Sequence, residues 1–224
     1  MGGCAASNLA NDKIVLTYFP FYARAEVIRM CLAQSGATWK SKTVLLGWLC
    51  DVIGRKCCCC PGMSPTKSLP MLQIDGKVLT STIACCNYLA KKFDMHHEDP
   101  HEAWKIDSAM DLCTEYLNKY VAMVATGKPD KAEEWWKENK VLKLGTLEGL
   151  LAQRSGKFLA GDKITIGDIA IFQLLHDGFV REKVRAERLA ELEGYPNLQG
   201  FCDQVFEGSN LLKTYVEKRP KYKF

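Results

Sequence analysis

A tyrosine and an arginine stand close together where an apolar run gives way to a helical pattern. The run "DKIVLTYF" contains Tyr18, and "RAEVIRMCLAQSG" begins with Arg24. A hydroxyl group that donates a hydrogen bond to a thiolate favours this charged form and lowers the pKa of the thiol. Because the thiolate is the nucleophilic form of a thiol, Tyr18 at the end of this run is placed to activate a bound thiol. A core tyrosine and an exposed arginine in a first helical turn are the alternative interpretations.

The elements around this pair form a βαβ pattern. The β-branched run over residues 12–19 predicts a buried strand, residues 24–36 a helix that ends at Gly36, and residues 39–46 a second strand. The crossover makes these two strands parallel. Residues 47–67 are irregular, and "LPMLQIDGKVLT" predicts two short strands that turn at Asp75-Gly76, before a helix over residues 81–93.

Only helices are predicted after this point. Their expected positions are near residues 100–126, 129–152, 166–178, 182–192 and 197–206. The helix at 166 has a strong start signal, because Thr165 and Asp168 have the spacing of a capping box, with Ile164 and Ile169 placed as a hydrophobic staple. We therefore expect a flexible extension over residues 1–12, an α/β domain over 13–93 and an all-α domain over 94–224.

Composition excludes several classes of function. The 30 basic and 26 acidic residues give a formal charge of +4, which is too mild for a nucleic-acid-binding protein. No apolar run is long enough to span a bilayer. Several of the eleven cysteines fall inside helical apolar patterns, where cysteine acts as a small hydrophobe, so reduced thiols and a cytoplasmic location are expected.

Three separated motifs resemble the cytosolic glutathione transferases: "LTYF" with "RAEVIRMCL", "SLPMLQIDGKVLTSTIACCNYLA" and "FLAGDKITIGDIAIF". The first is similar to the start of sigma-like, tyrosine-type members. The resemblance covers nearly all of the chain from about Lys13 and implies a thioredoxin-like βαβ-ββα domain followed by an all-α domain. It also implies glutathione as co-substrate, a homodimer and no metal.

The resemblance assigns roles to individual residues. Tyr18 matches the catalytic tyrosine, and Arg24 an arginine that supports the sulfur or the electrophile. Pro70 matches a cis-proline that presents the Leu69 backbone to an extended peptide such as glutathione. Trp48 and Thr82 match positions that hold glutathione, and Glu115 matches a carboxylate that reaches the glutathione of the partner subunit. Phe19, Phe21 and Leu117 match positions that line the pocket for a hydrophobic electrophile.

One position departs from the family pattern. Ser81 stands where the family usually has glutamine, although Thr82 keeps the hydroxyl and the helix start still favours an anion. Losing one or two hydrogen bonds of about 1 to 1.5 kcal/mol each would weaken glutathione binding about tenfold or more.

Four consecutive cysteines, Cys57, Cys58, Cys59 and Cys60, contain one C-x-x-C spacing, which suggests redox or zinc chemistry. The redox pair of a thioredoxin-like fold follows the first strand, where this chain has Tyr18. Adjacent cysteines cannot all point at one metal ion, and the histidines are distant in the chain. We interpret the run as an insertion with exposed thiols at the edge of the glutathione site.

The first residues, "MGGCAASNLAND", resemble an N-myristoylation start at Gly2, and Cys4 could carry palmitate. Ala6 does not fit the strict motif, so a plain tail is the alternative. Acylation would place the protein peripherally at a membrane.

Two hypotheses about the function stay open. The first is an enzyme that conjugates glutathione to electrophiles and, like some sigma-like members, isomerises lipid peroxides. The second is a weakly active or inactive relative that serves as a structural or ligand-carrying protein.

Overall fold

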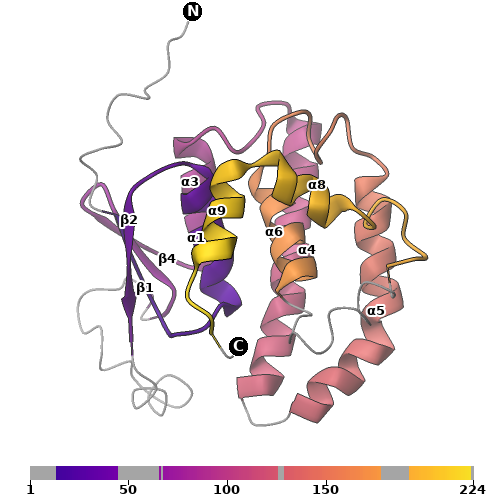
Figure 1. The fold of residues 1–224 in the computed structure, drawn as a ribbon, viewed down its shortest axis with the longest axis horizontal. Helices are drawn as coiled ribbons and strands as arrows, with labels where there is room; N and C mark the ends of the chain where they lie inside the picture. The colour runs from indigo at the N-terminus through magenta and orange to yellow at the C-terminus, as the bar shows by residue number, and fades with distance from the viewer. Residues whose placement is uncertain (1–13, 45–65, 67, 126–128, 178–191, 223–224) are drawn as a thin grey trace, which may run out of the picture.

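A four-stranded mixed sheet lies beside a group of helices in the part of the chain that the structure describes (Figure 1). This structure is a computed structural model, and it describes residues 14–44, 66, 68–125, 129–177 and 192–222. The strand order is β2-β1-β3-β4, in which β1 is parallel to β2 and antiparallel to β3. The parallel pair confirms the predicted crossover.

The strands are short and follow the predicted positions. They are β1 (Ile14–Tyr18), β2 (Trp39–Thr43), β3 (Met71–Ile74) and β4 (Lys77–Thr80). The central strands β1 and β3 are mostly buried, whereas Lys40 and Lys42 are exposed on the edge strand β2. Charged side chains on an edge strand discourage pairing with other chains. Asp75 and Gly76 take φ values of 51° and 71°, as the predicted hairpin turn requires.

Two helices of the first domain pack against each other beside the sheet, α1 (Ala23–Gln34) and α3 (Thr82–Lys92). Every residue of α1 from Ala25 to Leu32 is buried. A helix that is buried on all sides needs neighbours on all sides. Helices of the second domain supply them, because α1 also contacts α4, α6 and α9.

The remaining described helices are α4 (Pro100–Ala125), α5 (Pro129–Leu151), α6 (Ile166–His176), α8 (Phe201–Gly208) and α9 (Asn210–Lys218). The fold class, a thioredoxin-like domain followed by an all-helical domain, is thus confirmed, while the domain boundaries stay predictions. The first three of these helices lie where they were expected. The predicted helix near 182–192 falls outside the described residues, apart from Leu192.

Near the C-terminus, the start of one predicted helix was wrong and one helix was missed. The helix expected over residues 197–206 begins at Phe201, because Gly200 has a positive φ of 84° that no helix interior allows. The helix α9 was not predicted at all. Its signals were present: the Ser209 side chain accepts a hydrogen bond from the Leu212 amide as an N-cap, and Pro220 follows the helix end.

The start of α6 depends on a buried carboxylate. Asp168 is fully buried, and its side chain accepts hydrogen bonds from the Leu159 amide at 2.9 Å and the Thr165 amide at 2.8 Å. The Thr165 hydroxyl donates a third bond at 2.6 Å. Burial raises the pKa of Asp168 despite these bonds. The predicted capping box is confirmed, and it also fixes the loop before α6 through Leu159.

Four cysteines of the described residues belong to the core, whereas Cys202 is half-buried. Cys31, Cys85, Cys86 and Cys113 are buried and unpaired by disulfides, as their helical spacing predicted. No helix of the described residues is long and apolar enough to cross a membrane.

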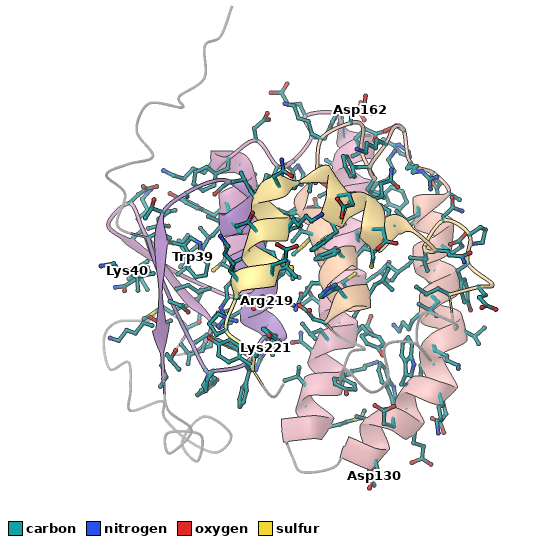
Figure 2. The ribbon with its side chains drawn as sticks, in the orientation of Figure 1. Trp39, Lys40, Asp130, Asp162, Arg219 and Lys221 are labelled. Atoms are coloured by element: carbon teal, nitrogen blue, oxygen red, sulfur yellow. The ribbon has the colours of Figure 1, made fainter. Side chains whose placement is uncertain are left out.

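We predict that Asp168→Ala lowers the free energy of unfolding by about 3 kcal/mol, because two buried backbone amides lose their acceptor. Asp168→Asn keeps one acceptor oxygen and should cost less. Asp130→Ala is the matched control, since Asp130 lies exposed in the first turn of α5 (Figure 2). Chemical denaturation of the three variants measures the difference. Equal, small effects for Asp168→Ala and Asp130→Ala would contradict the assignment.

Candidate active site

Three chain segments meet at one edge of the sheet. Thr17 of β1 pairs with Met71 of β3, and Met71 pairs with Thr80 of β4. The next residue along each strand therefore brings Tyr18, Pro70 and Ser81 to the same edge, side by side across the sheet. These are three of the residues that the sequence predicted to act together.

The peptide bond between Leu69 and Pro70 is cis, as predicted. Both residues are buried, and they directly precede β3. Leu69 thus lies two residues before Met71, the first residue of β3, at the edge of the sheet where β1 ends with Tyr18. The backbone of such a residue can pair with an extended peptide as an added strand would.

The N-terminus of α3 adjoins this edge. Ser81 is exposed and takes a positive φ of 70°, while Thr82 begins the helix and is buried. The Thr82 hydroxyl donates to the carbonyl of Arg24 at 3.3 Å, which joins the starts of α3 and α1. The first amide groups of a helix have no partner within the helix and favour an anion.

Tyr18 is held from several sides. Its exposed fraction is 3%, so its position is set by packing. The Phe19 ring meets it edge-on at 5.5 Å between centroids. The Arg29 guanidinium lies over the Tyr18 ring at 5.9 Å from the centroid, within the range of a cation–π contact. A buried tyrosine with a fixed ring is suited to aim its hydroxyl at one point.

Arg24 occupies the first turn of α1 and is half-buried. Its Nε atom is buried and has no hydrogen-bond partner among the described residues. A buried donor without a partner costs free energy unless another molecule satisfies it. The buried Nε atom does not fit the alternative interpretation of Arg24 as an exposed arginine. It could instead donate a hydrogen bond to a bound acceptor near the start of α1.

Ala23 is a site residue that the sequence did not single out. It has a positive φ of 33°, which is strained for a residue with a side chain. Its carbonyl accepts a hydrogen bond from Gln173 of α6 at 2.9 Å. This contact connects the loop after Tyr18 to the helical domain, and a non-glycine residue gave no sequence signal for it.

Two of the proposed electrophile-pocket residues lie close together. Phe19 is buried and its ring lies 6.2 Å from that of the half-buried Phe21. Leu117 is buried on α4. Their role stays a prediction.

Glu115 is paired with lysines of its own chain. It lies exposed on α4, where Lys119 and Lys143 of α5 bind its carboxylate at 3.1 and 3.3 Å. Hydrogen bonds from Lys119 and Lys143 hold the pKa of Glu115 below its ordinary value. Its predicted contact with glutathione across a dimer is not tested by a single chain.

Several predicted sites lie outside the described residues: Trp48, Gly2, Cys4 and the run from Cys57 to Cys60. Burial disfavours the thiolate form of two described cysteines, Cys85 and Cys113. Burial raises the pKa of Cys85 to about 12 and also raises the pKa of Cys113. The described residues hold no cluster of three side chains suited to a metal ion.

Comparison with known proteins agrees with this geometry. Residues 111–219 match the domain described as "Glutathione S-transferase, C-terminal domain". The chain is 27% identical over 221 residues to a probable glutathione S-transferase 6 of Caenorhabditis elegans, covering 93% of this chain and 98% of that relative. It is 29% identical over 163 residues to glutathione S-transferase P of Bos taurus, covering 71% and 74%.

Solved structures share the fold over 95% of this chain and their own full length. One is a glutathione S-transferase from Ascaris lumbricoides, with a TM-score of 0.73 and 23% identity. Another is Na-GST-3 from the hookworm Necator americanus, described as monomeric, with a TM-score of 0.75 and 23% identity.

We predict that Ala23→Gly leaves the free energy of unfolding unchanged or raises it, because glycine tolerates a positive φ. Ala33→Gly near the end of the same helix is the control and should lower stability by about 0.5 to 1 kcal/mol, the usual cost of replacing alanine by glycine in a helix. Thermal or chemical unfolding compares the two. If Ala23→Gly destabilises as much as Ala33→Gly, the positive φ carries no strain.

Proposed function

We propose that the chain is a glutathione S-transferase that joins the thiolate of glutathione to electrophilic small molecules at the edge where Tyr18, Leu69 and Ser81 meet; the match of residues 111–219 and the similar relatives support this proposal. The observation that carries this proposal is the buried Tyr18 beside cis-Pro70 and the start of α3. Sigma-like specificity and lipid-peroxide isomerisation are the finer part of the proposal. They rest on the sequence resemblance of the segment around Tyr18.

Each part of glutathione has a place in this proposal. The cysteinyl residue pairs with the Leu69 backbone in extended form, which cis-Pro70 makes available. The γ-glutamyl carboxylate faces the amides of the α3 start, with Thr82 beside it. Trp48 is expected at the glycine end. Two observations support this placement of glutathione: the buried Arg24 Nε has no hydrogen-bond partner among the described residues, and no side chain caps the first amides of α3.

The reaction needs little chemistry from the protein. The glutathione thiol releases its proton to solvent, and the hydroxyl of Tyr18 donates a hydrogen bond that stabilises the thiolate. The sulfur lone pair then forms a bond to the electrophilic carbon, and the leaving group departs with its bonding pair. Each unit by which the thiol pKa falls corresponds to about 1.4 kcal/mol.

A second function is favoured by one observation. Ser81 is exposed and too short to replace the amide of glutamine, so the γ-glutamyl group loses bonds. A weakly active relative that carries ligands or serves a structural role would tolerate this loss. Membrane anchoring through Gly2 and Cys4 would suit this role and is likewise a proposal.

The active assembly is proposed as a cytoplasmic homodimer in which Glu115 of each subunit approaches the partner's glutathione. In the single chain, Lys119 and Lys143 both bind the same oxygen of Glu115, Oε1. Because these contacts are exposed, they are weak enough to exchange.

We predict that Tyr18→Phe lowers kcat about 10- to 100-fold with a halogenated nitrobenzene, since a hydrogen bond to a charged group contributes about 1.5 to 3 kcal/mol. The KM for glutathione should change little. Tyr88→Phe is the control, because this hydroxyl bonds Asp75 at the hairpin, away from the site. Equal activity of Tyr18→Phe and wild type would remove the catalytic assignment. No turnover by wild type, with glutathione still bound, would favour the second function.

We predict that Ser81→Gln strengthens glutathione binding about 3- to 10-fold, the effect of one or two added hydrogen bonds. Ser81→Ala should bind as wild type does, because the short serine side chain makes no bond to the ligand. Calorimetric titration with glutathione measures both dissociation constants. Weaker binding by Ser81→Gln would show that the γ-glutamyl group does not reach this position.

A further inference from the structure

We propose that Arg29 is a positioning residue for Tyr18 and that the C-terminal segment Arg219–Tyr222, here called the tail, holds Arg29 in place. This inference rests on the proposed function, since it concerns how Tyr18 is aimed. It assigns a functional role to residues at the end of the chain that lie 190 or more positions from the tyrosine in sequence.

Arg29 lies between two aromatic rings. Its guanidinium carbon is 5.9 Å from the centroid of the Tyr18 ring and 5.5 Å from that of Tyr222. The exposed fraction of the Arg29 side chain is 3%, so these contacts are largely desolvated. Cation–π contacts gain strength when water is excluded. The ring of the tail and the ring of the candidate catalytic residue therefore share one cation.

Hydrogen bonds fix the guanidinium in this position. Arg29 Nη1 donates to Glu26 at 2.7 Å and to the carbonyl of Phe21 at 2.8 Å. Phe21 belongs to the loop between Tyr18 and α1. Arg29 therefore contacts both ends of the segment that must be ordered if the tyrosine hydroxyl is to point at one place.

The tail is anchored by a buried network around Glu26, whose side chain is fully buried. Glu26 Oε1 accepts a hydrogen bond from Arg219 at 2.7 Å and another from Tyr215 of α9 at 2.9 Å. Arg219 also binds Asp177, beyond α6, through both terminal nitrogens, at 2.7 and 2.6 Å. Figure 2 shows Arg219 at the end of α9, close to α1.

The charges of this network balance. Arg29 and Arg219 face Glu26 and Asp177, and His176 lies beside Asp177 at 2.7 Å. Burial alone would raise the pKa of Asp177, but hydrogen bonds from Arg219 and His176 outweigh it and hold this pKa below its ordinary value. Burial, with the Glu26 charge second, raises the pKa of Tyr215. Asp177 therefore stays charged and Tyr215 stays neutral near neutral pH.

Tyr22 also binds the tail. Its hydroxyl donates to the carbonyl of Pro220 at 3.0 Å and accepts from the Tyr222 amide at 3.4 Å. The Arg219 guanidinium lies over the Tyr22 ring at 4.3 Å. The tail is therefore tied to the loop after Tyr18 by its backbone as well as by its charges, and displacement of the tail would loosen this loop.

The test compares Tyr222→Leu with Tyr222→Phe. Leucine removes the aromatic face from Arg29, while phenylalanine keeps it; the backbone bonds to Tyr22 remain in both. For Tyr222→Leu we expect kcat with a halogenated nitrobenzene to fall about fivefold, the loss of roughly 1 kcal/mol. The KM for glutathione should stay within about twofold, and the acid limb of the pH–rate profile should move to higher pH. Tyr222→Phe should behave as wild type.

Two further measurements separate positioning from plain stability. The midpoint of thermal unfolding should change by less than about 2 °C in both variants. Amide hydrogen exchange of residues 18–24 should be about fivefold faster in Tyr222→Leu than in Tyr222→Phe. Arg219→Met releases the tail at its other end and should speed exchange of the same amides, with Asp162→Ala, an exposed loop position, as control.

The results distinguish this inference from the proposed function. If Tyr222→Leu and Tyr222→Phe match in kcat, pH profile and exchange, the positioning role is refuted. A loss of kcat that only follows a loss of thermal stability refutes it as well. If wild type shows no turnover, the proposed conjugation fails, and exchange of residues 18–24 alone decides whether the tail orders the loop after Tyr18.

Discussion

A helix buried on all sides that carries charged residues is the constraint on which the remaining structure depends. α1 is enclosed by α3 of its own domain and by α4, α6 and α9 of the next, yet it contains Glu26 and Arg29. A buried charge without a partner costs several kcal/mol, so each must find a counter-charge inside the protein. Arg29 supplies one for Glu26 from the same helix, and Arg219 supplies a second from the far end of the chain.

This arrangement joins the two domains at the point where chemistry is proposed. Gln173 of α6 binds the carbonyl of Ala23, and Arg219 binds both Glu26 of α1 and Asp177. The loop between Tyr18 and α1 is thus held by the helical domain as well as by the sheet. The strength of a hydrogen bond to a thiolate depends on the direction of the donor. An ordered loop after Tyr18 therefore supports the proposed reaction by holding the hydroxyl in one orientation.

The site itself is built from ends of elements. β1 ends at Tyr18, β3 begins just after Pro70, and α3 begins at Thr82. Strand register brings these ends together, and the helix start adds amide groups that favour an anion. A site of this kind can pair with an extended peptide through backbone groups, and this is the mode of recognition that we propose for glutathione.

The sequence by itself determined the elements and most of the sheet edge. Hydrophobic periodicity placed β1, α1 and α3–α6 because their apolar faces repeat with the period of the element, and the Asp75-Gly76 turn and the capping box at Thr165 are local signals. It missed α9 because the helix has only 9 residues. Its capping signal at Ser209 was available but stood among polar residues.

Tertiary structure alone decided the partners of the buried charges. Glu26 and Arg219 are separated by 193 residues, and no periodicity links them. The positive φ of Ala23, the unpaired Nε of Arg24 and the lysines that hold Glu115 are likewise results of packing. Local sequence specifies which face of an element is buried, but the identity of the group across that face depends on how the elements assemble.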